Sequence, residues 1–284
     1  MQPITAAQAA APRDGLAGAV GLGVVIPDDD PLDPGNDWPR GFNLEGIACH
    51  SGYVTDPGCE SGGNGRTWRR RWTHADLSTP FYVGAGVECS TMGSDLNMER
   101  WNREAGEELE RVQWAQIARE LWTGELSTNH QRLASPEATV LSEEPVTPTE
   151  AIGALEDAMA GCQLGQPDLI HVPRKATAYL ADRNLALSAQ QPTARLFTPN
   201  GSLVIADRGY TGSGPHDEAP TASVVWFYAT GVLSARLGPV SYAARQIEEA
   251  VDAETNDMRV RAERPVGVGW LCCHYAIPVC LTAT

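Results

Sequence analysis

The sequence has only one lysine, Lys175, and its 36 acidic residues against 21 basic ones give a net charge of −15 at pH 7. Proteins that hold nucleic acid through their overall charge need a basic surface, so this chain is not expected to bind DNA or RNA in that way. No apolar run reaches the length of a membrane span, and Met1 is not followed by a secretion signal. We therefore predict neither a membrane segment nor a sequence-specific nucleic-acid site.

The common catalytic motifs are also lacking. The sequence has no Walker loop, no HExxH, no GxSxG, and no GxGxxG followed by an acidic residue. His171 lies between Ile170 and Val172, where a hydrogen-bonded core histidine is the favoured interpretation. A cytoplasmic hydrolase with a pocket around His171, His216 or His274 stays open as an alternative, although nothing brings a serine, a histidine and an aspartate together. We predict no catalytic residue, no metal site and no cofactor.

The seven cysteines include no CxxC pair, and the adjacent Cys272 and Cys273 are expected to point to opposite faces of a strand. Two neighbours that point apart cannot easily bind one metal ion. Buried reduced thiols in a protein made in the cytoplasm are the favoured interpretation. A zinc site is the alternative, with the candidate ligands Cys49, His50, Cys59 and His74.

Residues 1–41 are predicted to form an arm, because their prolines exclude a regular helix and Asp28–Asp30 disfavour burial. Residues 42–80 are predicted to form an extended loop with a hairpin turn at Asn64-Gly65. Tryptophan and arginine alternate after that turn, a mixture that stacks on nucleic-acid bases but is also preferred in buried protein interfaces. The acidic chain favours protein contact. The candidate contact residues here are Trp38, Arg66, Trp68, Arg69, Arg70, Arg71 and Trp72.

The strongest helix signal covers residues 95–123. Ser94 or Asp95 is the expected N-cap, Gly124 is the expected left-handed stop, and apolar residues recur every three to four positions. At ~1.5 Å per residue this helix is roughly 40 Å long, more than an isolated small core needs. Its glutamates suggest a metal or acid–base cluster or, as we favour, a solvated face paired with arginines. The residues concerned are Glu104, Glu107, Glu108 and Glu110, with Arg103 and Arg111.

The second half of the chain alternates helices and strands. Thr147, Pro148 and Glu150 predict a capping box at the start of a second helix. A long exposed loop is expected at 208–221, and a helix is expected near 242–252. The other elements expected are helices at 147–161 and 174–184 and strands at 167–173, 201–207, 223–231, 233–239, 257–264 and 266–281.

One of these strands, 257–264, has a charged face, because Arg259 and Arg261 alternate with Met258 and Val260. Exposed lone charges contribute little to stability, so we expect this face to be covered or paired. The contact candidates on this strand are Arg259, Arg261, Glu263 and Arg264.

Three stretches carry a family resemblance. "NDMRVRAERPVGVGW" followed by "HYAIPV", "RELWTG" at the end of the long helix, and "PDLIHVPRKATAYLADRN" resemble segments of the Hong Kong 97-type fold of tailed-phage major capsid proteins and encapsulin shells. The resemblance implies an α+β fold. Its expected parts are an N-terminal arm at 1–41, an extended loop at 42–80, a peripheral domain with a spine helix at 81–147, an axial domain at 148–240 and closing strands at 241–284.

The resemblance implies a structural protein rather than an enzyme. It would assemble with itself into hexamers and pentamers of an icosahedral head shell, in the host bacterial cytoplasm, and would enclose double-stranded DNA in the virion. Scaffold, portal and cement proteins are expected partners. Some family members cross-link subunits through a lysine on the extended loop, but residues 42–80 contain no lysine, so that chemistry is not expected here. An encapsulin-like compartment and a phage neck or tail protein are the alternatives within the structural class.

Overall fold

The structure is a computed structural model. It describes residues 45–47, 72–74, 80–89, 97–126, 130–162, 169–185, 187–188, 196–231, 233–243, 250–252, 257–270 and 273–282. The predicted arm and most of the predicted extended loop, with the zinc candidates Cys49, His50 and Cys59, lie outside these residues. Within them, helices and strands are mixed, and the predicted α+β class is confirmed.

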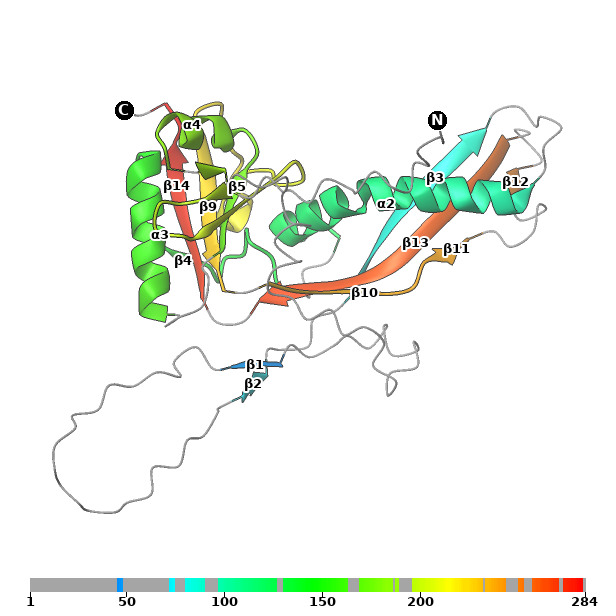
Figure 1. Cartoon of the computed structure of the whole chain (residues 1–284), viewed down its shortest axis with the longest axis horizontal. Helices are drawn as coiled ribbons and strands as arrows, with labels where there is room; N and C mark the ends of the chain where they lie inside the picture. The colour runs from blue at the N-terminus through cyan, green and yellow to red at the C-terminus, as the bar shows by residue number, and fades with distance from the viewer. Residues whose placement is uncertain are drawn as a thin grey trace, which may run out of the picture.

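The first part of the fold is a long β-ribbon covered by one helix, here called the ribbon unit (Figure 1). Strand β13 (Asp257–Trp270) pairs antiparallel with β3 (Phe81–Cys89) along one edge. Its other edge pairs with three short strands, which are β10 (Leu233–Leu237), β11 (Ser241–Tyr242) and β12 (Val251–Asp252). Helix α2 (Met98–Thr123) lies along this ribbon.

Helix α2 begins three residues later than predicted. Asn97 is its N-cap, and the Asn97 side chain accepts a hydrogen bond of 3.2 Å from the Arg100 amide, so Ser94 and Asp95 were the wrong candidates. This bond satisfies one of the amides that a helix leaves unpaired at its start. The end was predicted correctly, because Gly124 adopts the left-handed conformation with φ 61°.

The helix is held on the ribbon by an apolar stripe and by one side-chain amide. Ala105 and Leu109 are fully buried in the same core cluster as Met258 and Val260 of β13. Gln116 also bonds both backbone groups of Gly84 on β3, accepting from its N–H at 3.2 Å and donating to its C=O at 2.8 Å. The apolar stripe determines which face of α2 is buried. The Gln116 amide determines which residue of the helix lies beside Gly84 of β3.

The second part of the fold is a seven-stranded sheet with the order β4-β14-β9-β5-β8-β7-β6, here called the sheet unit. Strands β5 and β8 are parallel, whereas β9 is antiparallel to both β5 and β14. Helices α3 (Pro148–Cys162) and α4 (Ala176–Asp182) belong to this unit (Figure 1). The strands are β4 (Thr139–Val140), β5 (Leu169–Pro173), β6 (Leu187–Ser188), β7 (Leu196–Phe197), β8 (Leu203–Asp207), β9 (Val224–Thr230) and β14 (His274–Cys280).

The predicted capping box of α3 is confirmed. The Thr147 N–H donates to the Glu150 carboxylate at 3.0 Å, and the Glu150 N–H donates to the Thr147 hydroxyl at 3.3 Å. The hydrogen bonds from the Thr147 backbone and hydroxyl hold the pKa of Glu150 below its usual value. These reciprocal bonds define where α3 starts.

One loop prediction was wrong, and one helix prediction is corrected at its ends. Residues 208–221 are not a wholly exposed loop, because Tyr210, Gly212 and Pro215 are buried. A Cβ atom at Gly209 would overlap the backbone of Ala115 in α2, so the loop is packed directly on the helix. Of the helix predicted near 242–252, Ala250 is helical, Tyr242 belongs to β11, Val251 and Asp252 belong to β12, and residues 244–249 lie outside the described chain.

The structure also joins the two strands predicted at 257–264 and 266–281 differently. Strand β13 continues through Pro265 to Trp270. Because the carbonyls of Arg261 and Pro265 accept bonds from Ala243 and Gly238 on the far edge, the nitrogen of Pro265 also points away from β3. The missing N–H therefore costs the β3–β13 pairing nothing.

The preference for reduced thiols is corrected at one pair. Cys162 and Cys273 form a disulfide, with their Cα atoms 6.1 Å apart. They are separated by 111 residues in the sequence, and the packing of α3 beside β14 brings them together. No described helix is both long enough and apolar enough to span a membrane.

Candidate inter-subunit surface

The exposed face of the ribbon carries the charged residues predicted on strand 257–264. Arg259 and Arg261 are exposed and Glu263 is half-buried, whereas the alternating Met258, Val260 and Ala262 are buried under α2. The antiparallel register places Glu88 opposite Arg259. We call Glu88, Arg259, Arg261 and Glu263 the charged strip.

One end of the charged strip is paired within the chain. Arg259 donates from Nε to Oε1 of Glu88 at 3.0 Å, and its Nη2 lies 3.0 Å from the same oxygen. The two side chains are 51% and 59% exposed, so the pair contributes about 0–1 kcal/mol to stability. No ion pair joins Arg261 or Glu263 to another described residue. These two side chains carry opposite charges on this face of the ribbon.

Glycines on β3 leave space for the strip. Gly84 lies opposite Glu263, and Gly86 lies opposite Arg261. A Cβ at Gly84 would come 3.0 Å from Cγ of Glu263, and one at Gly86 would come 3.5 Å from Cγ of Arg261. The side chains of Glu263 and Arg261 therefore lie over the backbone of Gly84 and Gly86, where a larger residue on β3 would crowd them.

Arg264 faces the other way. Its side chain is 15% exposed, and its Nη1 lies 3.1 Å from Oε1 of Gln113 and 3.4 Å from Oε1 of Glu110, both on α2. Gln113 in turn donates to Glu110 at 2.6 Å. Of the four candidates on this strand, Arg264 connects β13 to α2, while the other three belong to the exposed face.

The tryptophan and arginine segment is described only at one end. Trp38, Arg66, Trp68 and Arg69–Arg71 lie outside the described residues. Trp72 belongs to β2 (Trp72–His74), which pairs antiparallel with β1 (Glu45–Ile47), so Trp72 lies opposite Ile47. This pairing brings the two ends of residues 48–71 together.

The glutamates of α2 form the solvated face that the sequence favoured. Arg100 pairs with Glu104 at 2.9 Å, and Arg111 donates to Glu108 at 2.9 Å. Glu108 raises the pKa of Arg111 above its ordinary value, chiefly by accepting this bond. A shallow, open hollow lies between this face and Gly86–Glu88 of β3. No three metal-ligating side chains come together anywhere in the described chain.

The three histidines considered for a hydrolase form no common site. His171 is fully buried, with Nδ1 2.9 Å from the Tyr210 hydroxyl and Nε2 2.9 Å from the Thr230 hydroxyl. Because Thr230 donates to Gly231, Nε2 of His171 carries the proton and Nδ1 accepts from Tyr210. Burial lowers the pKa of His171 to about 3, so this ring is neutral, as a core histidine.

The other two histidines have other contacts. His274 is close to His171, because it lies opposite Thr230 in the β14–β9 pairing and its charge also lowers the pKa of His171. Nε2 of His274 lies 2.9 Å from the Leu133 carbonyl, and burial lowers the pKa of His274 to about 4. His216 is exposed, in a left-handed turn with φ 62°. The favoured interpretation of His171 as a core histidine is confirmed by its burial and by its hydrogen bonds with Tyr210 and Thr230.

The sequence did not reveal the contacts between the two units at the end of α2. Nε1 of the buried Trp122 donates to the Ser213 carbonyl at 3.1 Å, and the Tyr228 hydroxyl of β9 donates to the same carbonyl at 3.0 Å. Ser213 lies in the loop that was predicted to be exposed. We call Trp122, Ser213 and Tyr228 the helix-end joint, because they connect α2 to the sheet unit.

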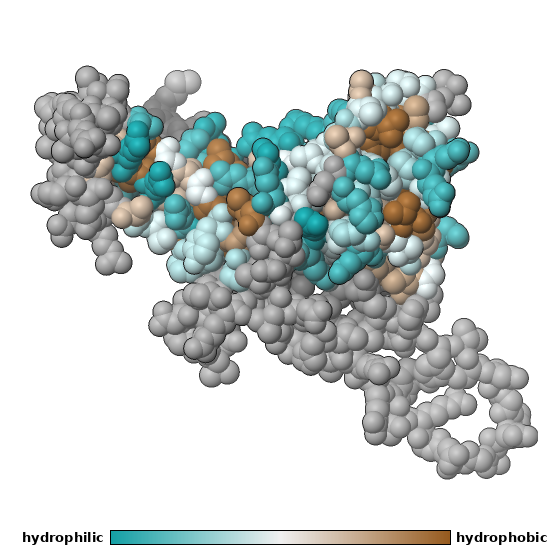
Figure 2. All heavy atoms as spheres, turned by 180° about the vertical axis from the view of Figure 1, so that it is seen from behind, coloured by the Kyte–Doolittle hydropathy of each residue, from teal (hydrophilic) through white to brown (hydrophobic). Residues whose placement is uncertain are grey.

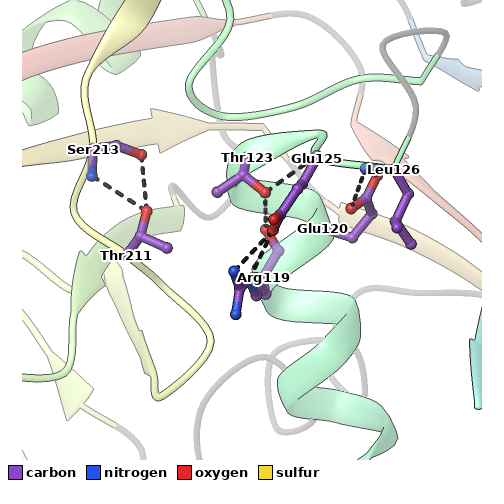
Figure 3. Close-up of polar contacts among 7 residues, drawn as sticks. All are labelled: Arg119, Glu120, Thr123, Glu125, Leu126, Thr211 and Ser213. Atoms are coloured by element: carbon purple, nitrogen blue, oxygen red, sulfur yellow. Dashed lines mark hydrogen bonds and ion pairs between the residues drawn. The ribbon is translucent and has the colours of Figure 1, made fainter. Parts of the chain in front are cut away.

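Hydrogen bonds and an ion pair hold the chain segments next to this joint, as Figure 3 shows. Arg119 pairs with Glu125 at 2.9 Å just beyond the helix end. The Leu126 amide donates to the buried Glu120 carboxylate at 3.1 Å. Thr211 and Ser213 bond to one another at 2.8 Å through their hydroxyls. The direction in which the chain leaves α2 is therefore fixed by local bonds.

The exposed large apolar residues are scattered across the molecule. They lie on different elements of both units. On the face shown in Figure 2, the brown spheres of hydrophobic residues also form separate groups among hydrophilic ones. These residues are Tyr82, Leu126, Val140, Tyr179 and Tyr242. The charged strip is therefore a more distinctive surface feature than any apolar patch of the described chain.

No protein-family model and no curated protein matches the sequence. Solved structures similar to this fold include the SrpI encapsulin of Synechococcus elongatus, at 11% identity and TM-score 0.46, covering 75% of this chain and 79% of that one. The capsid of Ralstonia phage GP4 is similar at 8% identity and TM-score 0.47, over 84% and 82% of the two chains. The capsid of cyanophage Pam1 is similar at 10% identity and TM-score 0.45, over 86% and 85%. These three structures are an encapsulin and two phage capsids.

Proposed function

We propose that this chain is the major capsid protein of a tailed bacteriophage, a non-enzymatic subunit of the icosahedral shell around double-stranded DNA. The observation that carries the proposal is the ribbon unit. One helix covers one face of a long β-ribbon, and the opposite face carries exposed, partly unmatched charges. A monomer gains little from such a face, whereas a closed shell needs several different contact patches on each subunit.

The order of the elements supports the same proposal. The extended pair β1–β2 comes first, followed by the long helix α2 and the sheet unit, and β13 then returns to pair with β3. On the proposed assignment, α2 is the spine helix, the ribbon is the peripheral domain and the sheet unit is the axial domain. The net charge of −15 suits a wall that encloses DNA without adhering to it.

The contact residues form two groups under this proposal. Arg261 and Glu263 meet opposite charges on a neighbouring subunit, and the segment with Arg66, Trp68 and Arg69–Arg71 reaches onto another copy. Hexamers and pentamers then form from the same chain through repeated heterologous contacts. Portal, scaffold and cement proteins are proposed partners on the grounds of the family resemblance alone.

Assembly can be tested with the full chain by size-exclusion chromatography and negative-stain microscopy. We expect closed particles of uniform size. A compact monomer or small oligomer at high concentration would refute a shell, and rings or tubes would indicate a neck or tail protein. Particles that carry a protein cargo and no genome would indicate an encapsulin-like compartment.

The arginine segment has its own test. We expect the triple substitution Arg66→Ala, Arg70→Ala and Arg71→Ala to block assembly while the subunit keeps its circular dichroism spectrum and its unfolding midpoint. Arg103→Ala, on the solvated face of α2, is the matched control and should assemble normally. Normal particles from the triple variant would exclude this segment from the contacts.

A further inference from the structure

The disulfide between Cys162 and Cys273 connects two elements that the fold already places together. Cys162 is the last residue of α3, and Cys273 directly precedes β14. Leu155 and Met159 of α3 pack in one core cluster with Ile277 of β14. Because this apolar contact does not depend on the bond, the two thiols can meet in a folded but reduced subunit.

Other contacts fix each element independently of the bond. In the middle of α3, Glu156 accepts hydrogen bonds from Ser202 at 2.8 Å and Asn200 at 2.6 Å, which lie in the turn before β8. Strand β14 pairs along its whole length with β9. The disulfide is therefore an addition to a site that non-covalent packing has already built.

The two sulfur atoms differ in access. Cys273 is 4% exposed, whereas Cys162 is only half-buried at the end of the helix. A small oxidant reaches Cys162 first, because access of the reagent to the sulfur limits thiol–disulfide exchange. Cys273 lies behind it as the second thiol.

The disulfide also lies at the connection between the two units and closes a long loop. Cys273 lies where the polypeptide passes from β13 of the ribbon unit to β14 of the sheet unit. The disulfide closes a sequence separation of 111 residues, which contains β5, β9 and most of the ribbon. Constraining so long a loop in the unfolded chain gives a large stabilisation.

We propose that Cys162 and Cys273 form a redox-controlled staple, which is open when the subunit folds and closes when the protein meets an oxidising medium. The proposal relies on the proposed function for one point, synthesis in a reducing bacterial cytoplasm, where protein disulfides are rare. Closure after release from the cell then strengthens the subunit without changing its fold.

The chemistry needs one low-molecular-weight disulfide as the oxidant. The Cys162 thiolate attacks it, forming a mixed disulfide and releasing one small thiol. The Cys273 thiolate then attacks Sγ of Cys162, forming the internal bond and releasing the second small thiol. Two protein thiols are oxidised and one small disulfide is reduced to two thiols.

The staple can be tested on the full chain expressed in the bacterial cytoplasm and quenched at lysis with N-ethylmaleimide. Peptide mapping should find Cys162 and Cys273 alkylated, and treatment with oxidised glutathione before alkylation should join them. The oxidised protein should unfold about 5–10 °C above the reduced protein. A bond already complete in the quenched lysate, a different cysteine pair, or no shift in midpoint would overturn the proposal.

Variants separate the staple from general stability. Cys162→Ser and Cys273→Ser should each abolish the redox-dependent shift, and Cys273→Ser should retain glutathione on Cys162. Cys280→Ser, at the other end of β14, should keep the full shift. Particle formation, imaged in parallel, distinguishes the two proposals: shells without a redox-dependent shift would leave the proposed function standing and remove the staple.

Discussion

The sheet unit and the ribbon unit differ in how many faces of their strands are covered. In β5 every residue is buried, and alternate residues belong to different core clusters, Leu169 to one and Ile170 to the other. In the first part of β13, over residues 258–262, only alternate residues such as Val260 are buried, and Arg261 beside it is exposed, whereas residues 265–270 of the same strand are all buried. A continuous apolar strand thus identifies the unit that is complete within one chain. An alternating strand identifies the unit that keeps a free face.

The largest expected effect comes from separating the two units at the helix-end joint. Trp122→Ala removes a fully buried indole and its bond to Ser213, and should lower the free energy of unfolding by about 3–5 kcal/mol. Denaturant unfolding followed by circular dichroism measures this. Trp101→Ala, a half-buried tryptophan on the same helix, is the control and should cost clearly less. Equal losses would mean that the joint has no special role.

The second prediction concerns acid. The folded-state pKa values of His171 and His274 are depressed to about 3 and about 4, so protons bind the unfolded chain first as the pH falls below the ordinary histidine pKa of about 6.5. Stability should therefore be complete above pH 6.5 and fall by about 1.4 kcal/mol per pH unit per histidine towards pH 4. His171→Leu should make this slope smaller by the contribution of one histidine, about 1.4 kcal/mol per pH unit. The exposed His216→Gln should leave the slope unchanged. Unfolding midpoints across pH 4–7.5 decide the matter.

A smaller effect is expected at the start of α3 in the sheet unit. Thr147→Ala removes the hydroxyl that caps the Glu150 amide and should cost about 1 kcal/mol. Thr149→Ala, on the exposed side of the same first turn, is the matched control and should be nearly neutral. Chemical denaturation resolves the difference. Equal changes in both variants would argue against the capping box as the source.

The smallest effect on stability, and the sharpest test of the comparison, concerns the free face of the ribbon. Arg261→Ala and Glu263→Ala should each change the free energy of unfolding by no more than about 0.5 kcal/mol, because neither side chain is paired within the described chain. Both should reduce the yield of particles, measured by light scattering and microscopy. Arg259→Ala, whose partner Glu88 is internal, should assemble better than either. Full assembly of all three variants would show that the charged strip is not a contact.

The sequence predicted the elements whose signals are local. The capping box at Thr147 and Glu150, the stop at Gly124 and the buried strand around His171 each depend on a few adjacent residues, and all are present. The start of α2 was misplaced because serine, aspartate and asparagine are all good N-cap residues, so Ser94, Asp95 and Asn97 could not be told apart by type. The structure shows that Asn97 is the N-cap.

The features that were missed depend on residues far apart in the chain. The loop at 208–221 was predicted to be exposed from its glycines and polar residues, but Gly209 and Gly214 are the residues that let it pack closely on α2 and Trp226. The partner of Cys162 could not be identified, because no local pattern relates it to Cys273. Strand alternation places Arg264 on the same face as Met258 and Val260, but no local pattern showed that Gln113 and Glu110 of α2 would pair with it there.

The amide of Gln116 has a consequence for how α2 can move. It bonds both the N–H and the C=O of Gly84, on the edge of β3 that is not paired with β13. The backbone groups of Val83 and Ala85 point towards β13 instead, because the direction alternates along an antiparallel strand. Sliding the helix by one residue would therefore break both bonds and offer none in exchange. Helix α2 therefore resists any slide shorter than the two-residue repeat of the strand, and the far end of the ribbon keeps its distance from the sheet unit against such small shifts.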